Sequence, residues 1–216
     1  MGHPLRLTLA AEVGAVNLAL CKRDRSGHET DQHRKIAPEN GSHPVSKTLL
    51  LLRHAKSSWS SPAESDFERP LNQRGERAAV VIGIMMKQEK IVPDLVLCSS
   101  ARRTLQTRDA IRPYLPRNCP VEETARIYEA NVENLFSVLS GQPETIQKLL
   151  LIGHNPGLEH LTLSLCGEAG GEGLARVLEK FPTGAMATIE LAIDSWRDIA
   201  PGKGRLCHFI TPKELV

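Results

Sequence analysis

The sequence lacks the features that mark several classes of protein. It has five cysteines, an odd number with no C-x-x-C pair, so it does not indicate a disulfide framework. No apolar run in it approaches the ~20 residues that a membrane-spanning helix needs. The net charge is only +2, which gives no reason to expect nucleic acid or a membrane as a partner. We therefore expect a cytoplasmic protein whose cysteines are reduced and mostly packed.

The first 46 residues differ in composition from the rest. From residue 21 onward they are rich in charge, His, Ser, Pro and Gly, and almost without apolar side chains. Such a segment buries too little apolar surface to offset the entropy lost on ordering. We expect a disordered or loosely docked extension over 1–46, without a secretory signal, because polar residues interrupt the apolar stretch over 5–20. Its histidines match no structural zinc spacing, so we expect no metal site there.

Residues 47–216 read as one domain in which strands alternate with helices. Three short apolar runs with polar boundaries indicate strands buried on both faces of a parallel sheet, at 49–52, 94–98 and 149–152. Patterns typical of helices occupy 73–90, the segment after 99–100, 131–140, 156–166 and 175–180. We expect Asn72 to cap the first of these helices and Ser99-Ser100 to cap the second. Alternation indicates edge strands at 186–193 and 205–210, whereas 121–128 is open between strand and loop. This order predicts a three-layer α/β/α sandwich with a mostly parallel central sheet.

A histidine or arginine follows each of the three apolar runs. Arg53 and His54 follow the first, Arg103 the second and His154 the third. In open α/β sheets, ligands bind beyond the carboxyl ends of the strands, so these side chains should converge. Guanidinium forks suit phosphoryl oxygens, and helix N-termini at this edge would add N–H donors. The convergence predicts a small cationic pocket that binds phosphate without a metal.

The same pocket offers a nucleophile. A neutral histidine nitrogen can attack phosphorus, and neighbouring arginines should keep His54 neutral near pH 7. Arg53, Arg103 and His154 would then meet the charge that develops on the phosphoryl oxygens. Further candidates for substrate binding are Lys56, Ser57 and Asn155. Whether the last of these donates to phosphate or only caps a helix is open.

Several segments, in matching order over 47–215, resemble the histidine phosphatase (phosphoglycerate mutase-like) superfamily. Its Arg-His-Gly signature corresponds to L-R-H-A at 52–55, with alanine where glycine is commonest. Its S-x-x-x-R-A-x-Q-T element corresponds to S-S-A-R-R-T-L-Q-T at 99–107 and selects Arg103 over Arg102. Its second-histidine element corresponds to G-H-N-P at 153–156. The SixA branch, the phosphohistidine phosphatases, resembles this chain also at 66–75 and 181–185.

The resemblance implies a phosphoglycerate mutase-like fold without a large cap domain, and a ping-pong phosphatase without a cofactor. His54 would take the phosphoryl group, and water would release it. A phosphorylated protein, such as a histidine phosphotransfer domain, is the implied partner. Larger members carry an acid for the leaving group, and the candidates here are Asp66, Glu68 and Glu129. The simpler interpretation of each is a solvated loop carboxylate.

Two alternatives stay open at this stage. The first is a phosphomonoesterase of the same superfamily that acts on a small phosphorylated metabolite. The second is a phosphate-binding module without turnover, which the presence of all four pocket residues disfavours. A mutase is disfavoured because mutases generally carry the cap and its acid.

Deletion of residues 1–46 is expected to leave phosphatase activity intact, because the pocket residues all follow residue 47. The measurement is phosphate release by the full chain and by the shortened chain at equal concentration. A loss beyond about tenfold, which is ~1.4 kcal/mol in barrier height, would assign the extension a role in catalysis.

Overall fold

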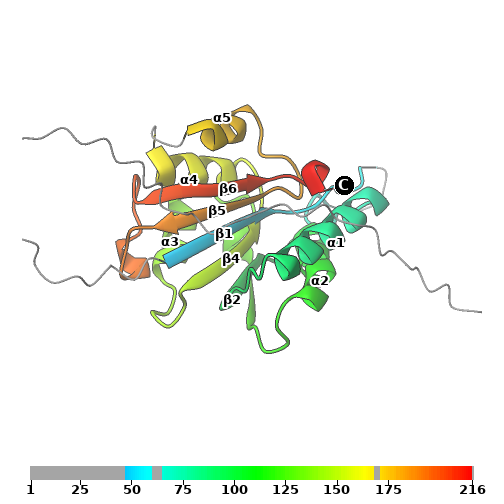
Figure 1. Ribbon diagram of the computed structural model, residues 1–216. Coiled ribbons are helices and arrows are strands. Elements are labelled where there is room, and N and C mark those ends of the chain that lie inside the picture. The colour runs from blue at the N-terminus through cyan, green and yellow to red at the C-terminus, as the bar shows by residue number, and fades with distance from the viewer. Residues whose placement is uncertain (1–46, 60–64, 168–170, 216) are drawn as a thin grey trace, which may run out of the picture.

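A six-stranded sheet lies at the centre of the computed structural model, which describes residues 47–59, 65–167 and 171–215. The extension expected over 1–46 lies outside these residues. The strands are β1 (Lys47–Arg53), β2 (Leu95–Ser99), β3 (Val121–Thr124), β4 (Lys148–Gly153), β5 (Met186–Leu191) and β6 (Gly204–Ile210). They lie in the order β3-β2-β4-β1-β5-β6 (Figure 1). The first four in that order are parallel, and β5 pairs antiparallel with both of its neighbours.

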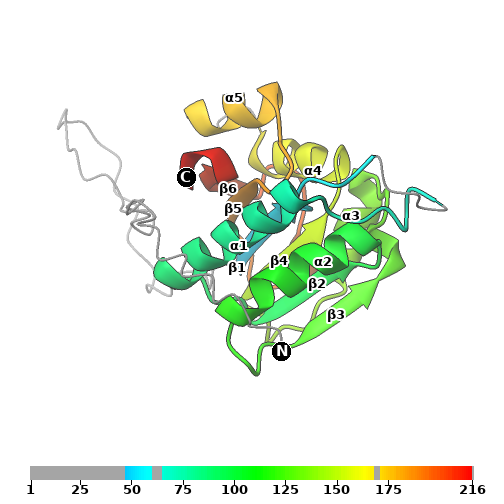
Figure 2. The same cartoon turned by 90° about the vertical axis from the view of Figure 1, so that its right-hand side faces the viewer.

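Helices cover both faces of the sheet. They are α1 (Gln73–Gln88), α2 (Arg102–Ile111), α3 (Val132–Ser140), α4 (Gly157–Cys166) and α5 (Gly171–Glu179). Apolar side chains of α1 and α2 share one core cluster with Leu50 and Leu52, while those of α3, α4 and α5 share the other with Leu49 and Leu51. Figure 2 shows α1 and α2 side by side over one face. The predicted three-layer sandwich with a mostly parallel sheet is confirmed.

The apolar run of β1 explains its central place in the sheet. Its four leucines, residues 49–52, are at most 1% exposed, which requires a covering layer on both sides. Burying such a side chain contributes about 1.5–3 kcal/mol. Alternate side chains point to opposite faces of a strand, so this run joins the two cores. The run then ends where charge begins, at Arg53.

The register of the central strands places their carboxyl ends side by side. Arg53 of β1 lies opposite Gly153 of β4, and Cys98 of β2 lies opposite Ile152 of β4. The residues that follow β1, β2 and β4 therefore begin at the same level of one sheet edge. This register produces the convergence that the three apolar runs predict.

Two local features differ from the expectations. The strand β5 lies inside the sheet, between β1 and β6, and is not an edge strand. The residue that caps α2 is Ala101, which makes no side-chain cap hydrogen bond, rather than Ser99 or Ser100. The segment left open at 121–128 splits into β3 and a short 3₁₀ turn, Ala125–Ile127. Over the ranges that the structure describes, no helix is long and apolar enough to cross a membrane.

The loop after β1 is fastened to the start of α1. Ser57 forms a β-bridge with Leu71, and the Asn72 backbone N–H donates to the Lys56 carbonyl over 3.0 Å. The Asn72 side chain caps α1, as its sequence position predicts, by accepting from the Gly75 N–H over 2.9 Å. Gly75 itself packs so tightly that a Cβ there would lie 2.1 Å from the Lys56 carbonyl oxygen. Close packing therefore fixes the backbone two residues beyond His54.

Substitution Gly75→Ala is expected to destabilise the fold by about 1–3 kcal/mol, because a backbone carbonyl cannot move aside as a flexible side chain can. The gain in helix propensity from alanine, about 1 kcal/mol, is too small to reverse the sign. Denaturant unfolding followed by circular dichroism measures the change. Gly141→Ala is the matched control, since a Cβ there meets only ordinary contacts at 3.7 Å. Equal stability of the two variants would contradict this account of the packing.

Candidate active site

The structure brings the four predicted pocket residues together. Arg53 ends β1 and His54 follows it, His154 follows β4, and Arg103 lies in the first turn of α2. The two imidazole rings face each other with centroids 5.3 Å apart. Both histidines are 6% exposed and Arg103 is 4% exposed. The arrangement is a buried pair of imidazoles with guanidiniums beside it.

The His54 ring is held in one orientation by the backbone. Its Nδ1 lies 2.8 Å from the carbonyl oxygen of Ala55. A carbonyl only accepts, so Nδ1 carries the proton and donates, and Nε2 keeps its lone pair. Burial is the main reason that the pKa of His54 falls to about 3, and the charges of Arg103, Arg53 and Arg69 lower it further. The imidazole is therefore neutral at pH 7, with the lone pair on Nε2.

His154 is held by a serine from the neighbouring strand. Its Nε2 lies 2.8 Å from Ser99 Oγ, and its ring meets the edge of Tyr128 at a centroid distance of 5.4 Å. Within the described part of the chain, His154 Nδ1 is buried and has no hydrogen-bond partner. Burial, followed by the neighbouring His54 and Arg103, lowers the pKa of His154 to about 3. This imidazole is also neutral at pH 7.

The two guanidiniums of the pocket are each anchored at one side. Arg53 Nη1 donates to the Phe181 carbonyl over 2.6 Å, and burial lowers the pKa of Arg53 without making it neutral at pH 7. Arg103 donates from Nη1 to the Asp66 carbonyl over 2.6 Å and pairs through Nη2 with the Asp66 carboxylate over 2.9 Å. The Nε atoms of both arginines are buried without a partner among the residues described. An oxyanion is the kind of acceptor that such N–H groups bind.

Asp66 receives donors on both of its carboxylate oxygens. Arg103 and the Tyr128 hydroxyl share Oδ2, at 2.9 and 3.1 Å, while Arg69 Nη2 lies 2.7 Å from Oδ1. Burial on its own would raise the pKa of Asp66, but Arg103, the Tyr128 hydrogen bond and Arg69 together hold it below its ordinary value. This carboxylate is ionised at neutral pH and does not carry a proton to donate.

The other predicted site residues lie around the pocket in different settings. Asn155 donates from Nδ2 to Glu159 Oε2 over 2.9 Å and to the Phe181 carbonyl over 3.2 Å, so its amide protons have protein partners. Lys56 is exposed, and Ser57 is buried in its bridge to Leu71. Glu129 is exposed on a left-handed backbone with φ of 48°. Glu68 is exposed as well.

Sequence reasoning did not assign roles to several groups that shape the pocket. These are Ser99, Tyr128, Thr107 and the backbone carbonyl of Phe181. Thr107 Oγ1 accepts from the Ala55 N–H over 3.0 Å and so fixes the turn after His54. The motif at 99–107 contains two of them, Ser99 and Thr107, so the sequence could have drawn attention to these two. Tyr128 and Phe181 come from distant loops. The resemblance at 181–185 marks the neighbourhood of Phe181 but not the role of its carbonyl, and Tyr128 is not marked.

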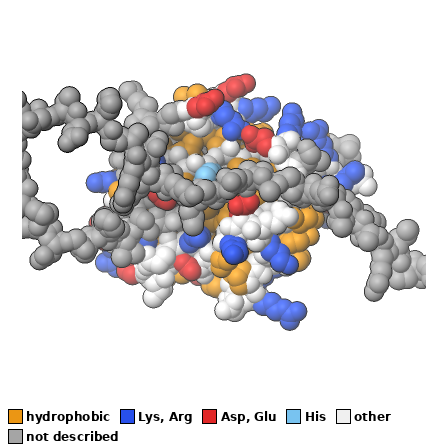
Figure 3. Space-filling model, in the orientation of Figure 1, with side chains coloured by type: hydrophobic (Ala, Val, Ile, Leu, Met, Phe, Trp, Pro, Cys, Tyr) orange, Lys and Arg blue, Asp and Glu red, His pale blue; other side chains and the backbone are white. Residues whose placement is uncertain are grey.

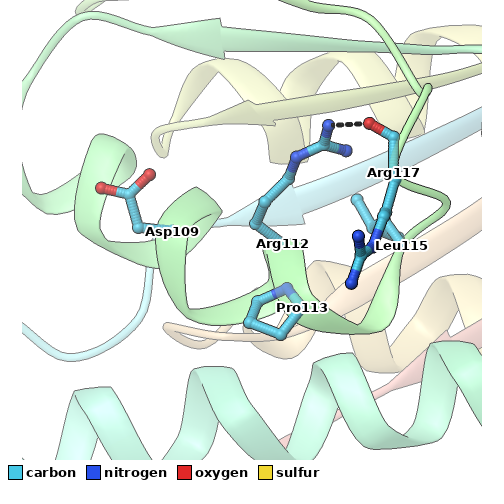
Figure 4. A pocket seen from close by; sticks show the side chains of 5 residues that line it. All are labelled: Asp109, Arg112, Pro113, Leu115 and Arg117. Carbon is cyan, nitrogen blue, oxygen red and sulfur yellow. Dashed lines mark hydrogen bonds between the residues drawn. The ribbon is translucent and has the colours of Figure 1, made fainter.

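A hollow elsewhere on the molecule is separate from this pocket. It is lined by Asp109, Arg112, Pro113, Leu115 and Arg117 (Figure 4). It lies at the end of α2 opposite to Arg103, about 15 Å along the helix axis. Arg112 already donates to the carbonyls of Pro116 and Arg117. Among the residues that the structure describes, no cluster of three His, Cys, Asp or Glu side chains could hold a metal ion.

Stability should fall as the pH drops from 7 to about 5.5. The unfolded histidines protonate near pH 6.5, whereas the folded pKa of His54 and His154 is about 3, so only the unfolded state gains protons in this window. Each histidine should contribute a loss of about 1 kcal/mol. Urea unfolding at the two pH values measures it.

The double variant His54→Asn, His154→Asn provides the control for that measurement. His208, whose pKa burial also lowers, keeps its own contribution in both proteins. Asp66 titrates below the window and adds nothing to the slope. An equally steep loss in the double variant would show that the two imidazoles are not buried as neutral groups.

The chain is similar to several known proteins. The model of the histidine phosphatase superfamily (branch 1) matches residues 49–147, which include Arg53, His54 and Arg103. An uncharacterized protein of Mycobacterium tuberculosis is 30% identical over 164 residues, which span 75% of this chain and all of that protein. The crystal structure of a candidate phosphohistidine phosphatase SixA from Agrobacterium tumefaciens is 31% identical, with a TM-score of 0.65, over 77% of this chain and 98% of that one.

A second solved structure shows the same fold at lower identity. It is the protein histidine phosphatase SixA complexed with tungstate, which is 22% identical with a TM-score of 0.65 and covers 78% of this chain and 99% of that one. The match extends along nearly the whole length of these SixA structures, so no large cap domain separates them from this chain. The chain belongs to the histidine phosphatase superfamily and is of the SixA type.

Proposed function

We propose that this protein is a phosphohistidine phosphatase that takes the phosphoryl group onto Nε2 of His54 and then passes it to water. The observation that carries the proposal is the fixed His54 ring. Its Nδ1 donates to the Ala55 carbonyl, and its Nε2 lone pair lies in a buried pocket with His154, Arg53 and Arg103. A neutral, oriented imidazole among guanidiniums is suited to attack on phosphorus.

The pocket supplies donors for the transferred phosphoryl oxygens. The buried N–H groups at Nε of Arg53 and of Arg103 have no other partner in the described ranges. The Ser99 hydroxyl can donate to His154 Nε2, which places the proton of that ring on Nδ1 and makes it a third donor. Charge-assisted bonds of this kind contribute about 1.5–3 kcal/mol each.

The first chemical step transfers the phosphoryl group between two imidazoles. The His54 Nε2 lone pair forms a bond to phosphorus, and the phosphorus–nitrogen bond of the substrate breaks with its electron pair moving to the leaving imidazole. In the second step water attacks phosphorus, its proton ends on the phosphate, and His54 leaves as neutral imidazole. The sum is phosphohistidine plus water giving histidine plus phosphate.

The state of the acid candidates favours phosphohistidine over a phosphomonoester. An alkoxide leaving group needs a proton, whereas a phosphorylated imidazole protonated on its other nitrogen leaves as a neutral molecule. Asp66 is ionised between two arginines and a tyrosine, and Glu129 is exposed. Asp66 fits a positioning role better than the role of an acid. The SixA relatives, one of them described as a protein histidine phosphatase, support the same substrate class, with the phosphohistidine presented on a partner protein.

The test incubates the parent chain and His54→Ala with radiolabelled phosphohistidine protein and measures the label that becomes bound covalently to each. We expect alkali-stable, acid-labile label on the parent and none on the variant, because only Nε2 of His54 accepts the phosphoryl group. Steady-state phosphate release should fall by at least about 10³-fold in the variant. Label on the variant would show that another residue is the nucleophile.

A screen of phosphate release from small esters separates the alternatives. A large preference for sugar phosphates over phosphohistidine protein would replace the proposal by a metabolite phosphatase. Binding of phosphoprotein without label or release would leave a phosphate-binding module. Arg102→Gln provides a matched control of charge, since Arg102 is exposed and adjacent to Arg103 in the chain, and it is expected to keep the trapped label.

A further inference from the structure

A third guanidinium lies beside the pocket, on the segment that leads from β1 to α1. Arg69 Nη2 lies 2.7 Å from Asp66 Oδ1, while Arg103 Nη2 lies 2.9 Å from Asp66 Oδ2. The two oxygens share one carbon atom, so the two guanidiniums that they bind must lie side by side. The Arg69 N–H also donates to the Asp66 carbonyl over 3.2 Å, which ties the turn to the same residue.

The Arg69 side chain is buried beyond what its ion pair requires. It is 12% exposed, and its Nε and Nη1 atoms are buried with no partner among the residues that the structure describes. Buried donors without partners carry a desolvation penalty, so native structures keep few of them. Among the described residues, Arg69 therefore has two nitrogen donors without an acceptor, as Arg53 and Arg103 each have one at Nε.

An indole fixes the plane of this guanidinium. The Arg69 Cζ atom lies 3.6 Å from the centroid of the Trp59 ring, which is itself 78% exposed. Stacking on an aromatic face orients the planar fork, and Asp66 binds the fork at Nη2. This exposed tryptophan thus orients an arginine.

Among the described residues, two acids pair with or act on the three arginines of this region. Arg53, Arg69 and Arg103 are the cations, Asp66 lies between two of them, and Glu159 acts on Arg53. Arg69 is also one of the charges that lower the pKa of His54, which places it within electrostatic reach of that ring. On the face that Figure 3 presents, by contrast, basic, acidic and uncharged side chains are interspersed. The excess of positive charge at the pocket suits a dianion.

We propose that Arg69 is a further phosphoryl-binding residue of this site, positioned by Asp66 and by the Trp59 indole. Its open donors would bind an oxygen of the phosphoryl group on the side away from Asp66. The ligand class is a tetrahedral oxyanion with two negative charges, either the phosphoryl group of the substrate or inorganic phosphate. The inference rests on the proposed function for the identity of the substrate, but the binding of phosphate can be tested without turnover.

The experiment measures binding of inorganic phosphate to the full chain by calorimetry. Arg69→Gln is expected to weaken phosphate binding by about 10- to 100-fold, since a charge-assisted donor pair is lost. Arg74→Gln is the matched control: it removes the same charge from an exposed residue nearby in the chain, and should change binding less than threefold. Thermal unfolding of each variant confirms that it is folded.

Two more variants separate charge from geometry. Arg69→Lys keeps the charge but lacks the fork and its stacking, and is expected to bind phosphate more weakly than the parent and more tightly than Arg69→Gln. Trp59→Ala removes the exposed ring and should weaken binding by about 2- to 5-fold through loss of the stack alone. If Arg69→Gln does not fold, these two variants still show whether Arg69 binds phosphate.

The outcomes distinguish this inference from the proposed function. If the parent forms the phosphohistidine intermediate but Arg69→Gln and Arg74→Gln bind phosphate equally, Arg69 is not a phosphoryl ligand and the inference is overturned alone. If the parent binds phosphate through Arg69 but hydrolyses no phosphohistidine, the proposed function fails and the inference stands. A parent that binds no phosphate in the millimolar range overturns the inference as well.

Discussion

The burial of positive charge against a single carboxylate is the constraint on which the site depends. Arg103 is almost completely buried, and a buried cation is costly unless it is paired and hydrogen-bonded. Asp66 meets that requirement with its carbonyl and one carboxylate oxygen, and its other oxygen binds Arg69. Burial lowers the pKa of both histidines, and the charge that remains on the arginines lowers it further, so the counter-ion and the neutral imidazoles are electrostatically coupled.

The sheet makes this balance possible because its backbone and its leucines hold the pocket residues in place. The pocket side chains themselves are not needed to build the core. The leucine runs of β1 and β4 fill two cores, and their parallel register brings Arg53 level with Gly153. The side chains at the ends of these strands, Arg53, His54 and His154, belong to neither core cluster. A shift of one residue in β1 would turn its side chains to opposite faces and separate His54 from His154, so burial of the leucines also fixes the geometry of the pocket.

The parts of the site that could be predicted are those fixed by one strand end each. Arg53, His54, Arg103 and His154 follow apolar runs or lie in the motif after one, and the common edge of a parallel sheet is a general rule. Ser99 could only be expected as a helix cap, since its bond to His154 depends on two strands that are 55 residues apart. Tyr128 and the Phe181 carbonyl approach through loops whose paths tertiary packing decides, and the inner place of β5 depends likewise on which strand it pairs with.

The electrostatics of the pocket also limit the reactions that it can perform. Burial is the main reason that His54 is neutral, and Arg103 and Arg69 both lower the pKa of His54 further and hold the pKa of Asp66 below its ordinary value. The carboxyl group of Asp66 is therefore ionised and has no proton to donate. Under the proposed function, such a site suits a leaving group that carries its own proton. Phosphorylated imidazole meets that condition and an alkyl phosphate does not. In the proposed reaction, the charge arrangement around Asp66 thus links a neutral His54 to the class of substrate.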